Sequence, residues 1–178
     1  LVLAIGQNMK IRRFVRVEGI CSSYIHMGGA VGVLVNFDTT DEVAATEDFA
    51  VMGKDVAMQI AAMSPSYLDP ASVPAEVLDH ETEILKAQMK EDPKMANKPE
   101  QVLAKIVEGK MGKYFSEVCL LEQTYVKDGD FTVGKYIESV AKKLGGDIKL
   151  VKYARLEKGE GLEKRSDNFA DEVASMMK

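Results

Sequence analysis

Three short runs that mix apolar, often β-branched or aromatic, residues with polar ones lie in the first quarter of the chain. The runs cover residues 11–18, 21–27 and 31–38. In the third run the apolar residues occupy every second position: Val31, Val33, Val35 and Phe37. Gly28 and Gly29 separate the last two runs and supply the positive φ that a tight connection needs. The pattern predicts a three-stranded antiparallel meander with one face covered by apolar helices.

A helical pattern follows these runs. Thr39 and Glu42 have the spacing of a capping box, which predicts that a helix begins there. Apolar residues then recur every three or four positions until Pro65 interrupts them: Phe49, Met52, Val56, Ile60 and Met63. This helix is expected to cover the sheet.

Two further helices are predicted over residues 74–115 as a helical hairpin. The first has Pro74 in its first turn, and a polar stretch at 91–99 separates it from the second. The first helix is expected to carry three apolar residues inward: Val77, Ile84 and Leu85. The second has five residues on one stripe: Leu103, Ile106, Val107, Lys110 and Tyr114. Two helices with so short a link suggest an antiparallel pair that projects from the sheet layer.

The last part of the chain predicts a helix over 131–144, which Gly145 and Gly146 end, then a strand over 148–156 and a turn at 159–161. Ser166 is expected to cap a last helix over 166–178. The fold class is therefore α+β: an antiparallel sheet of three to four strands covered by helices, with a projecting helical hairpin. We expect residues 1–178 to form one domain.

Composition and charge exclude several functions. The chain has 178 residues, 46% of them hydrophobic, and a formal net charge of −5. An acidic chain lacks the clustered cations that nucleic-acid binding requires, so a protein is the expected partner. The opening apolar run, residues 1–5, is too short for a signal sequence or a membrane span. We expect a cytoplasmic protein that binds neither membranes nor nucleic acid, and the Leu at position 1 suggests a fragment.

No motif predicts catalysis, a cofactor or a metal. The glycines at 28–32 and 159–161 lack the Lys-Ser or third glycine of phosphate-binding loops and are interpreted as turn residues. A metal site could draw at most on Cys21, His26, His80 and Cys119. Cys21 and His26 would lie on opposite faces of one strand, which argues against such a site. The same few residues give no local support for a Cys–His nucleophile.

Six segments in order resemble elongation factor Ts over essentially the whole chain. They are residues 5–14 (IGQNMKIRRF), 23–35 (SYIHMGGAVGVLV), 54–74, 98–128, 132–137 and 155–164. The resemblance implies a non-enzymatic guanine-nucleotide exchange factor for elongation factor Tu in translation. The sequence resembles the second half of the family's core, which is its C-terminal half and its dimerisation domain. The family's N-terminal domain and its first core half, with the Thr-Asp-Phe element, have no counterpart. The triplet Glu47-Asp48-Phe49 and the run 166–169 look like that element but lie in the wrong place.

The resemblance also implies where the partner docks. Elongation factor Tu, GDP-bound or nucleotide-free, is the expected partner, and no cofactor is needed. Tyr24, His26, Met27 and Gly28 are expected to contact its third domain, although a solvated surface loop is an equal alternative. In the last helix, Phe169 and Val173 are either partner contacts or residues packed on the chain's own sheet. A self-association module, forming a homodimer through an exposed sheet face or edge, is the alternative function.

Overall fold

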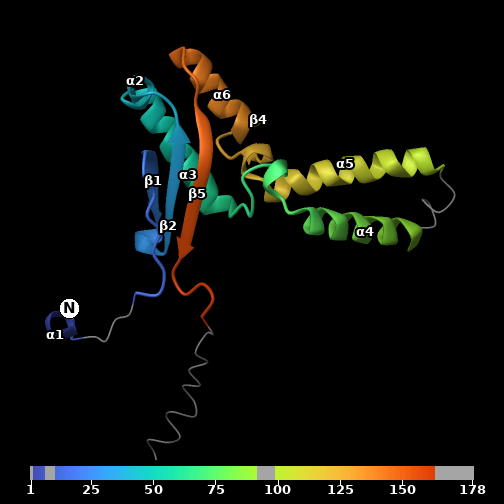
Figure 1. Cartoon of the computed structure of the whole chain (residues 1–178), viewed down its shortest axis with the longest axis horizontal. Coiled ribbons are helices and arrows are strands. Elements are labelled where there is room, and N and C mark those ends of the chain that lie inside the picture. Colours follow the sequence, from blue (N-terminus) through green and yellow to red (C-terminus); the bar gives the residue numbers. More distant parts are fainter. Residues whose placement is uncertain (1, 7–10, 92–98, 163–178) are drawn as a thin grey trace, which may run out of the picture.

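The computed structural model describes residues 2–6, 11–91 and 99–162 of the chain. Its central feature is a three-stranded antiparallel sheet with the order β1-β2-β5 (Figure 1). The strands are β1 (Ile20–His26), β2 (Val31–Asp38) and β5 (Lys149–Glu157). The α+β prediction is confirmed, and so are the hairpin formed by β1 and β2 and the late strand.

One face of the sheet packs on helix α3 (Glu47–Met63), and the other face has no helix over it in Figure 1. The alternating residues of β2 face α3 and are buried, with Val35 fully inaccessible. The residues of β1 that pair with these positions lie on the same face of the sheet. Tyr24 and His26 therefore face α3, and Ile25 faces the open side. The predicted core stripe of α3 is largely confirmed, since Met52 and Ile60 are fully buried there; Met63 remains 50% exposed.

The predicted strand at residues 11–18 is wrong. This segment has no regular secondary structure and belongs to no ladder, and Ile11 and Phe14 are 86% and 83% exposed. Its apolar residues do not alternate strictly, because Arg12 and Arg13 are adjacent, so pairing would leave no continuous apolar face. Strand β5 takes the third place in the sheet by pairing with β2.

The predicted capping box is also wrong. Thr39 donates its hydroxyl to the carbonyl oxygen of Asp147 at 2.7 Å instead of capping a helix. The neighbouring Thr40 caps the short helix α2 (Asp41–Ala44), and Thr46 caps α3 by accepting from the backbone N–H of Phe49 at 3.2 Å. Two caps in succession divide the predicted helix into two.

The helical hairpin consists of α4 (Ala75–Glu91) and α5 (Glu100–Val118) and projects from the sheet body (Figure 1). At its base, residues 66–68 run alongside 118–121, joined by backbone hydrogen bonds such as Leu120 N–H to Tyr67 O at 2.9 Å. The prediction that Ile84 faces inward is wrong, because this side chain is 36% exposed, whereas Met89 is buried.

Several short elements complete the described part of the chain. They are α1 (Val2–Ile5), η1 (Met27–Gly29), η2 (Pro70–Ser72), η3 (Leu120–Glu122), β3 (Thr124–Tyr125), β4 (Asp128–Thr132) and α6 (Val133–Leu144). The helix predicted from residue 131 begins at Val133, because Thr132 caps it and Phe131 belongs to β4. Gly145, with φ 69°, ends α6 as predicted. The last helix predicted, over 166–178, lies outside the described residues.

Buried polar side chains of α3 hold the β3–β4 hairpin and α6 in place. Asp55 is 7% exposed and accepts a hydrogen bond from the Tyr125 hydroxyl at 2.8 Å, while Lys127 Nζ lies 2.6 Å away. One turn later the fully buried Gln59 donates to Gln123 Oε1 at 3.2 Å and accepts from the backbone N–H of Val126 at 2.9 Å. Because these groups are satisfied, they fix the position of the segment that follows α5.

Candidate functional site

The connection between β1 and β2 is a sharply turned, exposed tip. Met27, Gly28 and Gly29 have φ values of 47°, 62° and 99°, all in the left-handed region. Glycine adopts this conformation freely, but Met27 pays roughly 1–2 kcal/mol of strain for it. Its side chain is 76% exposed, so the strain is not offset by burial. Backbone strain of this kind clusters at binding and active sites, which makes the tip a candidate site.

Tyr24 and His26 lie just below this tip on the helix side of the sheet. The Tyr24 hydroxyl is 3.1 Å from His26 Nδ1, and the two rings are 5.8 Å apart. Tyr24 packs against the core and is only partly exposed. The structure therefore brings these two predicted site residues together as a support for the tip, while Met27 and Gly28 form the tip itself.

Contacts from both ends of the described chain brace the tip, and no local pattern of residues predicts them. Arg13 Nη2 is 2.8 Å from Glu160 Oε2, and Arg12 donates to the backbone carbonyl of Glu160. The Arg13 guanidinium holds the pKa of the Glu160 carboxyl below its ordinary value. The backbone N–H of Lys158 donates to the Ala30 carbonyl at 2.8 Å, which fixes β2 where it leaves the tip.

Ile25 adds to the exposed surface near the tip. It lies on the open face of the sheet and is 65% exposed. The sequence analysis did not select Ile25. It lies between Tyr24 and His26 in the strand, so it faces the side of the sheet opposite to theirs. Ile25 and Met27 together make this end of the sheet apolar on its outer surface.

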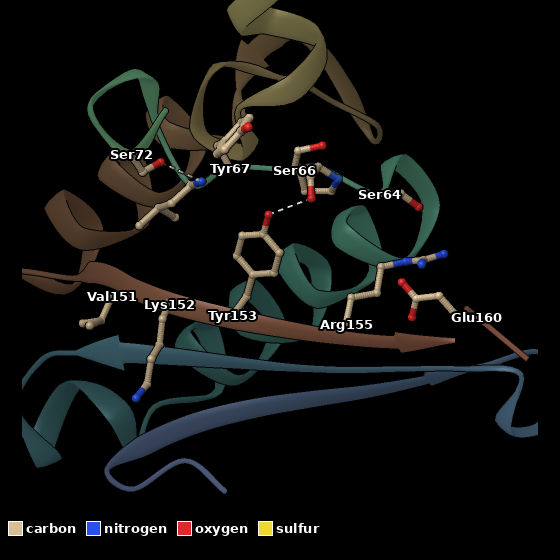
Figure 2. A pocket seen from close by; sticks show the side chains of 11 residues that line it. Ser64, Ser66, Tyr67, Ser72, Val151, Lys152, Tyr153, Arg155 and Glu160 are labelled. Carbon is tan, nitrogen blue, oxygen red and sulfur yellow. Dashed lines mark hydrogen bonds between the residues drawn. The ribbon is translucent and has the colours of Figure 1, made fainter. Parts of the chain in front are cut away.

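A cavity of about 620 Å³ lies between β5 and the segment that joins α3 to α4 (Figure 2). The Tyr153 hydroxyl donates across it to the Pro65 carbonyl at 2.7 Å, and burial raises the pKa of Tyr153 to about 12. Arg155 and Glu160 lie at one end of the cavity, and Ser66 and Tyr67 line its wall (Figure 2). The lining contains hydroxyl groups and charges but no histidine or cysteine, so it offers no activated nucleophile.

Within residues 2–6, 11–91 and 99–162, the side chains present no grouping suited to metal binding. No cluster of three or more His, Cys, Asp or Glu residues there could hold a metal ion. Cys21 and His26 face opposite sides of the sheet, as expected. Cys119 is fully buried, and burial raises the pKa of its thiol to about 11, so it is unreactive near neutral pH.

The remaining residues considered from the sequence are placed as follows. Phe49 of the triplet at 47–49 is 4% exposed and packs edge to face on Phe37, so it belongs to the core and is not available to a partner. Phe169 and Val173 lie outside the described residues. In the described part of the chain no helix is long and apolar enough to cross a membrane.

These features define a class: an α+β domain whose exposed, braced strand connection suits the binding of another protein. The family model described as Elongation factor TS matches residues 1–160, and the chain belongs to the elongation factor Ts family. It is 46% identical to elongation factor Ts of Syntrophotalea carbinolica over 180 residues, which covers 99% of the chain and 57% of that relative. The Clostridioides difficile protein is also 46% identical, over 179 residues, with 99% and 57% covered. Elongation factor Ts of Syntrophomonas wolfei is 49% identical over 162 residues, covering 90% of the chain and 74% of the relative.

The resemblance drawn from the ordered segments is thereby confirmed. The chain spans 57% of the length of the first two relatives.

Proposed function

We propose that this chain docks on elongation factor Tu through the β1–β2 tip and promotes GDP release without covalent chemistry. The exposed, strained Met27 carries the proposal, because an apolar side chain held away from its own core gains most when a partner covers it. Full burial of a methionine side chain contributes about 1.5–3 kcal/mol.

The proposed contact is with the third domain of elongation factor Tu. The tip is suited to it because Tyr24, His26 and the Arg13–Glu160 ion pair hold the connection from both sides. A connection held in advance loses less conformational entropy on binding than a mobile loop. Binding to the GDP-bound and nucleotide-free states with different affinities is sufficient to loosen GDP, since such coupling is reciprocal.

Binding and exchange are expected to separate in this chain. Its sequence contains no Thr-Asp-Phe triplet, the element that the family resemblance associates with the partner's magnesium site. A coupling of about 1–3 kcal/mol weakens the affinity of elongation factor Tu for GDP about 5–150-fold. Larger accelerations of GDP release require direct disruption of the phosphate and Mg²⁺ contacts. Stopped-flow release of fluorescent GDP should therefore show far slower release with this chain than with the Syntrophotalea relative. Equal rates would refute this separation.

Calorimetric titration of nucleotide-free elongation factor Tu tests the docking surface. Met27→Asp is expected to weaken binding at least about tenfold, because a charge replaces a buried apolar contact worth more than 1.4 kcal/mol. Val126→Asp is the matched control, since Val126 is 47% exposed on the distant β3–β4 connection. If Met27→Asp binds as tightly as the unaltered chain, the tip is not the docking surface.

Self-association is the second candidate function. It is favoured by the outer edge of β1, which carries no charged residue, no proline and no bulge. Sedimentation equilibrium with and without elongation factor Tu distinguishes the two functions. A stable homodimer that does not respond to the GTPase supports self-association, and a monomer that forms a heterodimer supports docking.

A further inference from the structure

Arg155 of strand β5 carries a buried hydrogen-bond donor without a partner. The strand register pairs Arg155 with Val33, so its side chain lies on the face of the sheet that packs on α3. This side chain is 19% exposed, and its Nη2 lies 2.8 Å from Glu157 Oε2. Its Nε is buried and unbonded, the one side-chain nitrogen or oxygen in that state within the described part of the chain. An unpaired buried donor is costly, so Nε is suited to an acceptor supplied by another molecule.

The cavity between β5 and the segment that follows α3 lies beside this guanidinium (Figure 2). Arg155 extends from β5 toward that segment, on which Ser64 and Ser66 present hydroxyl groups. Tyr67 and Leu68 add apolar surface to the wall. The cavity volume of about 620 Å³ is typical of sites for small molecules, which measure about 300–1,000 Å³.

Backbone strain marks the same cavity. Ser64 ends α3 with φ 49°, in the left-handed conformation that glycine usually adopts at this position. In the described part of the chain, Ser64 and Met27 are the two residues other than glycine with positive φ. Residues held in such conformations cluster at binding sites. Met27 forms the tip, and Ser64 lies on the cavity wall, so the strain indicates a second site independently of the unpaired nitrogen.

The charges at this end of the cavity favour a singly charged anion. Nε and Nη2 of an arginine form one edge of a planar fork, which matches the two oxygens of a carboxylate. Glu157 occupies only Nη2, and Glu160 lies at the same end of the cavity, paired with Arg13 at 2.8 Å. Two carboxylates so close repel a phosphate dianion more strongly than a carboxylate.

We propose that this cavity binds a small molecule that carries one carboxylate on an apolar body, and that Arg155 holds the carboxylate through Nε and Nη2. The ligand replaces Glu157 on Nη2 and also supplies an acceptor to Nε. The Glu157 side chain is 47% exposed, so it can move into water when it is displaced. The apolar body lies against Tyr67 and Leu68. Glu157 is therefore an internal competitor of the ligand.

The pair Arg16–Glu18 is a matched control within the chain. Its two residues have the same spacing, and Arg16 Nη2 lies 3.0 Å from Glu18 Oε1. Both side chains are 81% exposed, so the guanidinium is hydrated. A carboxylate in solution gains little by binding to an arginine of this kind.

Titration with sodium benzoate, followed by nitrogen-15 NMR of the arginine Nε–H groups, tests the site. Benzoate has one carboxylate on a planar apolar body, and benzamide is its uncharged isostere. The Arg155 resonance, identified by its loss in Arg155→Lys, should shift and saturate with benzoate but not with benzamide. The Arg16 resonance should stay in place, and phosphate should bind more weakly than benzoate.

Two substitutions should change the affinity for benzoate in opposite directions, measured on the backbone amide resonances of Ser64 and Ser66. Glu157→Gln removes the competitor and should tighten binding up to about fivefold, whereas Glu18→Gln should leave it unchanged. Arg155→Lys keeps the charge but loses the fork, so it should weaken binding at least about tenfold. Glu157→Gln changes a half-exposed side chain and keeps the test available if Arg155→Lys does not fold.

Four results would overturn the proposal. The first is the absence of a saturable shift of the Arg155 resonance with benzoate. The second is an equal response to benzamide or to phosphate, which would remove the selectivity for a carboxylate. The third is an equal shift of the Arg16 resonance, which would indicate unspecific ion pairing. The fourth is unchanged affinity in Glu157→Gln, which would exclude the competition at Nη2.

Discussion

Gly53 of α3 is the position where the helix approaches the sheet most closely. A Cβ atom built on Gly53 would lie 2.1 Å from Ser22 Oγ and 2.8 Å from Ser22 Cβ. Neither distance is compatible with van der Waals packing, so Gly53→Ala must push α3 and β1 apart by about 1 Å or more. Since β1 leads directly into the tip, the change would also disturb the proposed docking surface.

The sign of the stability change depends on two opposing terms. Alanine is favoured over glycine inside a helix by about 1 kcal/mol. Overpacking a tight contact costs typically about 1–3 kcal/mol. Because the clash involves a backbone-attached Cβ as well as a hydroxyl, we take the upper part of that range. Gly53→Ala should therefore lower the free energy of unfolding by about 1–2 kcal/mol.

Urea unfolding followed by circular dichroism gives the required free energies. Ser22→Gly removes both clashing atoms, so the double variant Ser22→Gly/Gly53→Ala should show a favourable coupling of about 1–3 kcal/mol. Gly109→Ala on α5 is the control, since nothing lies within 4 Å of its Cβ position, and it should stabilise the chain by about 1 kcal/mol. If Gly53→Ala stabilises as much as Gly109→Ala, and the double variant is additive, the close packing is refuted.

Three other predictions concern buried groups. Asp55→Ala should lower the free energy of unfolding by about 2–3 kcal/mol in urea titrations, because the Tyr125 hydroxyl loses a charged acceptor; no loss would contradict the network. Cys21 should react with a thiol reagent in the folded chain, and Cys119 only on unfolding, because its pKa is raised to about 11. The pKa of Tyr153 is raised from 10.0 to about 12, so its contribution to stability is complete below pH 10.0 and is lost as the pH rises through about 12. Tyr153→Phe should reduce this alkaline decline in melting temperature, and an unchanged decline would exclude Tyr153 as its source.

Local patterns predicted most elements of the fold. The alternation in β2, the glycines of the tip and Gly145 at the end of α6 are short-range signals, and each was confirmed in position. The errors have long-range causes. Residues 11–18 resemble a strand locally, but β5, more than a hundred residues away, takes the place beside β2. The local pattern predicts Thr39 as a helix cap, but its hydroxyl bonds to Asp147 instead, and no local pattern reveals so distant a contact.

The candidate site shows the same division. Met27 and Gly28 could be selected because paired glycines between two strands predict an exposed connection. The ion pair that braces the tip could not be predicted from the sequence, because Arg13 and Glu160 are 147 positions apart. Ile25 could not be predicted as exposed, because the local sequence does not show which face of the strand the helix covers.

Hydrogen exchange of the chain with and without nucleotide-free elongation factor Tu tests the central claim most directly. The account predicts slower exchange on binding in the connection from Ile25 to Val31, with no change in α4, which projects away from the tip (Figure 1). Unchanged exchange at the connection in a complex that demonstrably forms would contradict docking through this surface.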